Sequence, residues 1–367
     1  MAALGAVNAI ACVPTVRFGP ERQSTVWPVE LGGARHDPSA TEHLGPAPRA
    51  QWRAVAGRAV RGVPAIGESV IALGTVDRLV SLVSRDSGIV LWQHRLGGTI
   101  HGGPLLRGDR VYAGTEASPD GKVYALTLKT GKQVWSTRVG SVEAPLALDD
   151  TALYAGTEEG LVVRIDARSG AIAWRRRLAG AVRAAPVPST AGLAVVTTDD
   201  SLYLLKPETG EVLARRGTPG AVLATPVQDG DRLYLATTRG QVVAVALPSL
   251  ATVWERTAGD AVYGAPALVR DTLFVLARNG ALWLVPVATP AAARCLDLHV
   301  VATAGPTPLA DGTVLIGTVQ GELLLVAAAT GTIAWRDSLA GPIEQPPLVR
   351  DGQLLVVAGR GDLHAYR

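Results

Sequence analysis

Short apolar segments separated by turn residues run from about residue 50 to the end of the chain, and this pattern predicts β-strands. From residue 60 onward one unit recurs. A proline opens a short apolar strand, a second strand ends in Gly-Thr or a similar pair, glycine opens a third strand, and a Gly-x-x-x-Trp hairpin follows. Such regular recurrence predicts a repeat protein. The opening prolines, spaced 39 to 42 residues apart, are Pro64, Pro104, Pro145, Pro186, Pro226, Pro266, Pro308 and Pro347.

A tight turn precedes the third strand of every unit. It carries aspartate in two units, at Asp77 and Asp200, and glycine in the other six, at Gly121, Gly160, Gly240, Gly280, Gly321 and Gly361. Both residue types fit, because tight hairpins often need a positive φ. Three positions later comes a bulky apolar or aromatic residue in seven of the eight units. That choice suits a strand packed between neighbouring sheets.

The last hairpin of the unit carries tryptophan. The Gly-x-x-x-Trp motif is complete at Trp92, Trp135, Trp174 and Trp335 and degenerate in other units. A large flat side chain at this position would fill the wide outer gap between radiating sheets. We therefore assign a structural role, in docking neighbouring sheets, to Trp52, Trp92, Trp135, Trp174, Trp254 and Trp335.

Four short strands in each unit of about 40 residues predict an all-β propeller. The last unit, from residue 347 to the end, stops after about three strands. Its missing outer strand is available at the front of the chain, where residues 51–55 include Trp52. We therefore predict that residues 50–367 form an eight-bladed β-propeller of four-stranded antiparallel blades, closed by an N-terminal strand.

The N-terminal 49 residues lack this repeat. Residues 1–11 are apolar and rich in small residues, and they precede Cys12, which is the outline of a secretion signal that ends at a lipidated cysteine. The box departs from the usual bacterial form because Ala9 stands where leucine is commonest and no basic residue precedes the apolar stretch. The alternative is an ordinary apolar tail. Residues 13–49 are rich in proline, and we expect an extended tether or a strap on the surface.

Composition and charge exclude several classes of protein. The chain is 48% hydrophobic and 18% charged, which suits a folded core, and its small net charge of +3, with arginines scattered along the chain, argues weakly against nucleic acid binding. The run Arg175 to Arg177 is expected to be a solvated outer strand, and the alternative is a basic patch. The two cysteines cannot form a disulfide framework, and Cys295 is expected to be a small core residue.

No catalytic or metal-binding motif emerges. The chain has no glycine-rich phosphate loop, HExxH helix or GxSxG elbow, and its six histidines show no ligand spacing. We expect no metal site and no cofactor. The pairs Asp149-Asp150 and Asp199-Asp200 fall at expected hairpin turns, where aspartate is favoured by the backbone.

One set of positions is a candidate binding site. Residues three positions before each opening proline should crowd around one mouth of the central channel, where a propeller would hold a ligand or a partner loop. The alternative is that they are solvated loop residues. The eight positions are Arg61, His101, Val142, Arg183, Leu223, Tyr263, Gly305 and Glu344, and the five candidates that can hydrogen-bond are Arg61, His101, Arg183, Tyr263 and Glu344.

Units such as residues 123–135, which read VYALTLKTGKQVW, resemble the pyrroloquinoline quinone (PQQ) repeat. The resemblance extends over about residues 50–367 and implies a quinoprotein-type propeller. Quinoprotein dehydrogenases share these repeats, but they are much longer, carry insertions that build the cofactor site, and typically show an adjacent cysteine pair. Cys12 and Cys295 cannot supply that pair.

In length, blade number, N-terminal cysteine and final hairpin the chain resembles more closely the BamB family of outer-membrane assembly lipoproteins. The resemblance implies docking of a partner barrel protein through a loop with leucine and arginine before one blade, and through an aspartate-bearing insertion before the next. The corresponding loops here, residues 178–183 and 218–222, are short, and the second contains no aspartate. Only Arg183 is therefore carried over.

These observations lead to one functional expectation. The chain should be a non-catalytic, periplasmic scaffold, lipid-anchored through Cys12 to the outer membrane. Its partners should be envelope proteins such as an outer-membrane barrel assembly protein, with no nucleic acid, and it should be a monomer within a complex. The alternative is a PQQ-like small-ligand binder or sensor, or a relative of the quinoprotein oxidoreductases.

Overall fold

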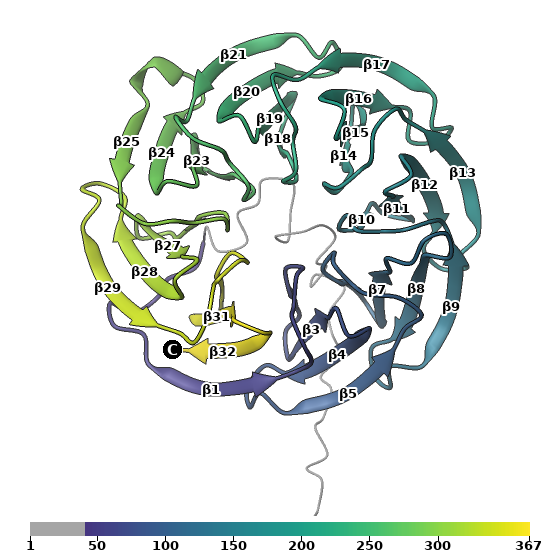
Figure 1. Ribbon diagram of the computed structural model, residues 1–367, viewed down its shortest axis with the longest axis horizontal. Helices are drawn as coiled ribbons and strands as arrows, with labels where there is room; N and C mark the ends of the chain where they lie inside the picture. The colour runs from purple at the N-terminus through teal and green to yellow at the C-terminus, as the bar shows by residue number, and fades with distance from the viewer. Residues whose placement is uncertain (1–40) are drawn as a thin grey trace, which may run out of the picture.

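Each repeat folds into an antiparallel sheet of four strands because every apolar segment is followed by a tight turn that lets the next one pair beside it. The computed structural model describes residues 41–367, and eight such sheets stand around a central axis (Figure 1). The predicted eight-bladed propeller is confirmed. The only helix among these residues is the single 3₁₀ turn η2 (Pro290–Ala292) in blade 6.

The strands are numbered along the chain, and blade 1 begins at β2. The first four blades comprise β2 (Ala65–Ile66), β3 (Val70–Gly74), β4 (Leu79–Ser84) and β5 (Val90–Arg95); β6 (Leu105–Arg107), β7 (Arg110–Gly114), β8 (Lys122–Thr127) and β9 (Gln133–Arg138); β10 (Ala147–Leu148), β11 (Ala152–Gly156), β12 (Leu161–Asp166) and β13 (Ile172–Arg177); and β14 (Val187–Ser189), β15 (Gly192–Thr197), β16 (Ser201–Leu205) and β17 (Val212–Gly217).

The remaining four blades follow the same order, except that the last one takes its outer strand from the front of the chain. They comprise β18 (Val227–Asp229), β19 (Arg232–Ala236), β20 (Gln241–Ala246) and β21 (Thr252–Thr257); β22 (Ala267–Val269), β23 (Thr272–Leu276), β24 (Ala281–Pro286) and β25 (Arg294–Asp297); β26 (Thr307–Pro308), β27 (Thr313–Gly317), β28 (Glu322–Ala327) and β29 (Ile333–Ser338); and β30 (Leu348–Arg350), β31 (Gln353–Ala358), β32 (Asp362–Tyr366) and β1 (Ala50–Val55).

Burial follows position in the blade. The second strands, such as β3 and β15, are buried at every residue because both faces of the sheet pack against neighbouring blades. Outer strands such as β13 alternate between half-buried and exposed residues, since only one face meets the next blade. This is why inner strands read as continuous apolar runs, while most of the arginines that lie in strands are found in the outer strands.

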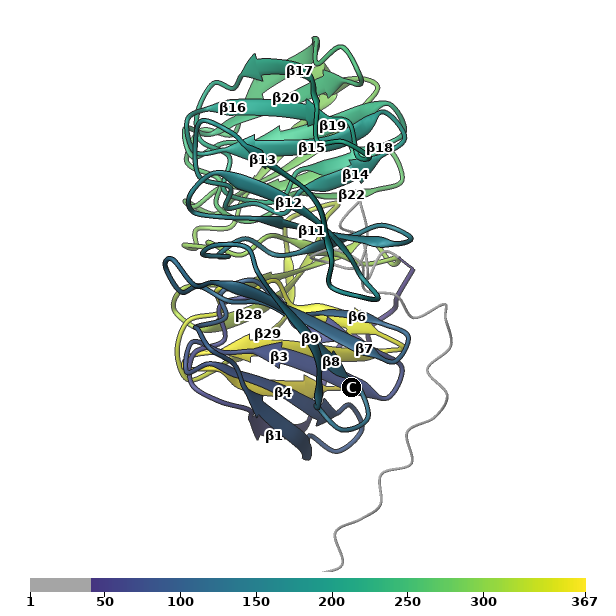
Figure 2. The ribbon, with the colours of Figure 1, turned by 90° about the vertical axis from the view of Figure 1, so that its right-hand side faces the viewer.

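Seen edge-on, the strands cross the thickness of the ring, so their turns form its two faces (Figure 2). The turns between second and third strands, such as that at Gly160, share one face with the loops that lead to the next blade, such as residues 178–186; we call this the mouth face. The turns between first and second strands and between third and fourth strands, such as those at Gly108 and Gly131, form the far face.

Tryptophans of the outer strands pack on the following blade. The ring of Trp135 lies over the turn of blade 3, where a Cβ on Gly170 would approach its Cδ2 atom to 2.6 Å, and Gly170 has a φ of +76°. Glycine is therefore required for two reasons, the positive φ of the backbone and the close approach of the indole ring.

The same arrangement joins Trp52 to Gly88, Trp92 to Gly131 and Trp174 to Gly210. In each of these four cases the indole Nε1 donates to a backbone carbonyl of the next blade, that of Arg85, Leu128, Ala167 or Pro207.

The other two predicted tryptophans dock differently. Trp335 meets Tyr366 of blade 8 edge-on, with ring centroids 5.9 Å apart. Trp254 packs in the core beside blade 6, but its buried Nε1 has no acceptor within residues 41–367. Blade 6 lacks the Gly-x-x-x-Trp turn and carries η2 there, which explains why the usual carbonyl is missing.

Arginines two residues after the tryptophan position are a second docking element that the sequence analysis missed. Arg176 donates to the carbonyl of Gly210 at 2.6 Å, and Arg216 and Arg256 donate in the same way to Leu250 and Pro290 of the next blades. The run Arg175 to Arg177, which was expected to be solvated, is therefore only partly solvated. Arg175 and Arg177 also donate to backbone carbonyls, those of Arg138 and Glu159.

Comparing a tryptophan whose Nε1 has an acceptor with one whose Nε1 has none measures the contribution of the indole hydrogen bond to stability. Trp174 and Trp254 have matching stacking partners, Tyr154 at 6.3 Å and Tyr234 at 5.9 Å, but only Trp174 donates, at 2.8 Å. We expect Trp174→Phe to lower the free energy of unfolding by about 1 kcal/mol more than Trp254→Phe, because only the first change leaves a carbonyl unpaired. Urea denaturation of both variants measures the difference. Equal losses would show that the indole hydrogen bond contributes nothing.

The ring is closed by β1, which pairs with β32 as predicted. Blade 8 is then joined to blade 1 through Arg85, whose side chain is only 7% exposed. Its guanidinium donates to Gln353 Oε1 at 3.1 Å, to Asp351 Oδ2 at 2.7 Å and to the carbonyl of Arg350 at 2.6 Å. A buried arginine with three partners on the neighbouring blade makes this junction specific as well as apolar.

Residues 41–49, the end of the segment expected to be a tether or strap, lie along blades 7 and 8 on the far face. The carbonyl of Glu42 accepts from Ala310 N at 3.0 Å, and its Oε2 accepts from Gly352 N at 3.2 Å. Leu44 is buried and packs in a cluster with Leu309. Residues 1–40, including Cys12, lie outside the described part of the chain.

The expectation for Cys295 is wrong. Cys295 is exposed on β25, the outer strand of blade 6, where it lies opposite Trp283 of β24. The apolar stretch before it forms η2 and the start of an outer edge rather than an interior strand. Apolar composition alone could not distinguish these two places.

Candidate functional site

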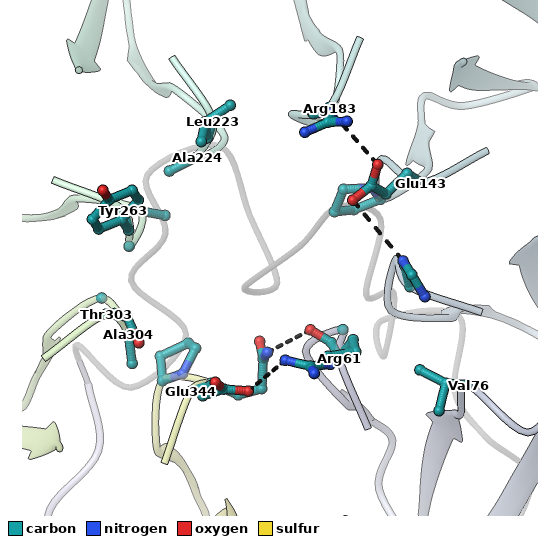
Figure 3. A pocket seen from close by; sticks show the side chains of 18 residues that line it. Arg61, Val76, Glu143, Arg183, Leu223, Ala224, Tyr263, Thr303, Ala304 and Glu344 are labelled. Carbon is teal, nitrogen blue, oxygen red and sulfur yellow. Dashed lines mark hydrogen bonds and ion pairs between the residues drawn. The ribbon is translucent and has the colours of Figure 1, made fainter. Parts of the chain in front are cut away.

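The loops that enter each blade form the mouth of the ring. In every loop a buried apolar residue anchors the chain, and the next residue is directed to the axis. The anchors are Val60, Ile100, Val142, Val182, Val222, Val262, Ala302 and Ile343, all at most 6% exposed. The residues that follow them all line one pocket of about 590 Å³, and they are Arg61, His101, Glu143, Arg183, Leu223, Tyr263, Thr303 and Glu344 (Figure 3). We call this the mouth pocket.

The set of eight residues predicted to surround the mouth needs one correction and one addition. Val142 is fully buried as an anchor, and its neighbour Glu143 lines the pocket instead. Gly305 does line the pocket, but Thr303 is the equivalent of the other ring members. Counting three positions back from each opening proline gave the wrong residue in two loops. Relative to the ring residue, Pro145 stands one position earlier than the other opening prolines, and Pro308 stands two positions later. The buried apolar residue before each ring position was the better signal, since the corrected residues are 40 to 42 apart.

Charged side chains occupy one arc of the mouth. Arg61 Nη1 lies 2.8 Å from Glu344 Oε2, and both side chains are about half exposed, at 53% and 42%. Gln345 also donates to the carbonyl of Arg61. Ion pairs this exposed contribute only about 0–1 kcal/mol to stability. The Arg61–Glu344 ion pair therefore holds both side chains in place at the mouth, and a charged group of a partner can replace either side chain in the pair at little cost in free energy.

Arg183 lies further round the same arc and faces two glutamates. Its Nη2 donates to Glu158 Oε2 at 2.9 Å, and its Nε lies 3.5 Å from Glu143 Oε2. Burial and a hydrogen bond with Glu158 raise the pKa of Glu143 to about 7. Burial acts in the same direction on Glu158, but hydrogen bonds with Arg183 and Glu143 outweigh it and hold the pKa of Glu158 below its usual value.

His101 connects this group to a third glutamate. Its Nδ1 lies 3.3 Å from Glu116 Oε2 and 3.9 Å from Glu143 Oε1. Thr99 donates to Glu116 Oε2 at 3.2 Å and fixes that carboxylate. The arc from Glu344 to Arg183 therefore holds two separate groups of polar contacts, one around Arg61 and Glu344 and one that runs from His101 to Arg183.

The opposite arc is largely uncharged. Leu223, Tyr263 and Thr303 line it, and Tyr263 is 41% exposed despite its size. Figure 3 shows Tyr263 across the pocket from Glu143 and Arg61. The mouth thus offers an aromatic surface on one side and charges on the other, which suits recognition of an amphipathic group.

The lining does not suit a quinone cofactor. Pyrroloquinoline quinone is a tricarboxylate, whereas the pocket and its immediate neighbours present four glutamates, at 116, 143, 158 and 344, against Arg61 and Arg183. Within residues 41–367, no three His, Cys, Asp or Glu side chains gather in an arrangement that could hold a metal ion. In the same part of the chain, no helix has the length and apolarity to cross a bilayer.

Comparison with known proteins gives the family. The model of the family described as Outer membrane protein assembly factor BamB matches residues 24–146, 119–213, 201–290 and 280–367. Two curated proteins of that name are similar to the chain. The one from Moranella endobia is 29% identical over 140 residues, 34% of this chain and 35% of the relative. The one from Shewanella oneidensis is 27% identical over 169 residues, 41% and 40%. The aligned segments thus span well under half of these relatives' length.

Solved structures share the fold at lower identity. BamB from Moraxella catarrhalis superposes with a TM-score of 0.72 at 17% identity, covering 87% of this chain and 99% of that one. A quinohemoprotein alcohol dehydrogenase from Comamonas testosteroni gives 0.77 at 12% identity, covering 94% and 81%. At these identities the likeness shows the propeller fold alone. The family model, by contrast, matches without a gap from residue 24 to the end, and the chain therefore belongs to the family of the outer membrane protein assembly factor BamB.

Proposed function

We propose that this protein is a non-catalytic scaffold of the cell envelope that takes part in outer-membrane protein assembly by docking a partner protein at its mouth pocket. The observation that carries the proposal is the mouth itself. Half-exposed ion pairs on one arc face an exposed tyrosine on the other, and ion pairs this exposed contribute only about 0–1 kcal/mol to stability. Recognition of a protein loop requires only such a surface.

Family membership supports the assembly role, because the curated relatives carry that name. The proposed location is the periplasmic side of the outer membrane, with Cys12 as the site of lipid attachment. Residues 41–49 lie on the far face, so a tether that precedes them would start on the side away from the mouth. Anchoring and docking would then not compete for one surface.

The docking proposal can be tested with a double variant. We expect Arg183→Ala combined with Glu344→Ala to reduce recovery of outer-membrane assembly proteins about tenfold, because it removes a charged contact from each of two separate ion pairs. Affinity capture from envelope extracts followed by quantitative mass spectrometry measures this. The matched control is Asp109→Ala with Lys129→Ala, two exposed charges on the far face. Equal recovery with both double variants would contradict docking at the mouth.

The size of the mouth pocket favours one second candidate, a small-ligand binder. A volume of about 590 Å³ falls in the range of small-molecule sites. A purified protein that carries a quinone would show its absorbance, and this would favour the candidate over a scaffold. In the pocket and its immediate neighbours four glutamates outnumber two arginines, which argues against such an anionic ligand.

A further inference from the structure

Five side chains, each from a different loop or turn of three neighbouring blades, meet on one side of the mouth pocket. His101 and Glu116 belong to blade 2, Glu143 and Glu158 to blade 3, and Arg183 to the loop that enters blade 4. We call them the mouth cluster. Arg183 Nη2 to Glu158 Oε2 is 2.9 Å, Arg183 Nε to Glu143 Oε2 is 3.5 Å and His101 Nδ1 to Glu143 Oε1 is 3.9 Å. Glu143 stands at the centre, in contact with a group on each side.

The charges in the cluster do not balance. Three carboxylates share one arginine, because the ionisable groups of residues 41–367 seen to act on Glu143 are His101, Glu116, Glu158 and Arg183. Two carboxyl groups in contact cannot both ionise without a cost. The arginine is committed to Glu158, with three contacts between 2.9 and 3.3 Å, so the remaining proton is held by Glu143. The raised pKa of Glu143 agrees with this geometry.

We propose that the mouth cluster is a proton-operated switch that sets how strongly the mouth pocket binds its partner. With Glu143 protonated, the cluster carries two carboxylates and one arginine. When Glu143 loses its proton, a third negative charge appears beside the pocket. The cluster gains one negative charge when Glu143 loses its proton, so the favoured partner is a loop that presents a basic side chain, and its binding strengthens as the pH rises from 6 to 8. The effect on partner binding rests on the proposed docking function, whereas the protonation change at Glu143 does not.

The proton can be observed directly. In the full chain labelled with ¹³C at glutamate carboxyl carbons, one resonance is expected to titrate near pH 7 and to vanish in Glu143→Gln. In Glu158→Gln its midpoint should fall by about one pH unit or more, because Arg183 is then free to pair with Glu143. If no glutamate carboxyl titrates between pH 6 and pH 8, the switch does not exist.

Thermal stability gives a second readout. Folding raises the pKa of Glu143, so the stability it contributes is present below its unfolded value of about 4.5 and is lost as the pH rises toward 7. Glutamine mimics the protonated side chain and does not titrate. We therefore expect Glu143→Gln to match the native chain at pH 4 and to melt at a higher temperature at pH 8. The control Glu322→Gln, in an ion pair with Arg336 outside the mouth pocket, should show no such divergence. Parallel melting profiles for Glu143→Gln and the native chain would overturn the switch.

Docking is tested with a photo-crosslinking amino acid at position 263, across the pocket from the cluster. In envelope preparations we expect about three- to tenfold more adduct with the partner at pH 8 than at pH 6, and a low, constant yield in Glu143→Gln. An adduct that does not change with pH would overturn the inference but leave the proposed function standing. The absence of any adduct at either pH would contradict docking at the mouth. The carboxyl titration would still decide whether the switch exists.

Discussion

Replacing Trp135 with alanine is expected to lower the free energy of unfolding by about 3 kcal/mol. The indole covers Gly170 of the next blade, stacks at 6.0 Å on Tyr112 and donates from Nε1 to the carbonyl of Ala167 at 3.3 Å. Alanine would leave a cavity between blades 2 and 3, and the glycine turn would have nothing to pack against. Urea denaturation followed by circular dichroism gives the loss directly.

The adjacent residue supplies the control. Val134 lies on the same strand, points to the opposite side and is 42% exposed. Val134→Ala should therefore cost less than about 1 kcal/mol. If both variants lose the same amount, the tryptophan is not what joins the blades.

Arg85→Met is expected to destabilise the protein by about 2–4 kcal/mol, because methionine keeps the apolar stem but removes the charged hydrogen bonds of the junction between blades 1 and 8. The change leaves Gln353 Oε1 and the carbonyl of Arg350 without their donor. Thermal denaturation measures the loss. Faster hydrogen exchange in β30, β31 and β2 would locate it at the junction.

A surface ion pair within blade 8 provides the comparison. Arg53 pairs with Asp362 at 2.7 Å, but its side chain is 59% exposed. Arg53→Met should cost about 0–1 kcal/mol. An effect of Arg85→Met no larger than this would mean that apolar packing and strand pairing alone close the ring.

The fold could be predicted almost completely from the sequence. Each blade repeats the same local signals, and the strand pairing they imply is between neighbours in the chain. Even the exceptional pairing of β1 with β32 was predictable, because Trp52 supplies the outer-strand tryptophan that the last unit lacks. Regular repetition makes such predictions reliable, since each copy checks the others.

The mouth was predicted less well because it depends on loop register. Proline marks the start of a strand but tolerates a shift of one or two positions, and this shift placed Val142 in the ring instead of Glu143. The consequence was large, since Glu143 is the centre of the mouth cluster. Its partners Glu116 and Glu158 come from turns between second and third strands, and no single-repeat pattern indicates that they meet there.

The docking arginines show a different limit. Arg176, Arg216 and Arg256 each reach a carbonyl of the next blade, but as outer-strand residues they look like ordinary solvated positions in the sequence. Cys295 shows the reverse error, because an apolar neighbourhood concealed an exposed position. Both cases depend on which side of an outer strand meets the following blade.

The shared blade also fixes the order in which the protein can be completed. Arg53 and Asp362 are 309 residues apart, so a chain made or exported from its N-terminus carries β1 long before β32 exists. Until then β1 has an open edge, and such edges pair readily with other chains. Seven blades can assemble from neighbours as they emerge, but the eighth must wait for the last residues. The final strand is thus the latest step of folding, and it ends the period in which the nascent chain is exposed to aggregation.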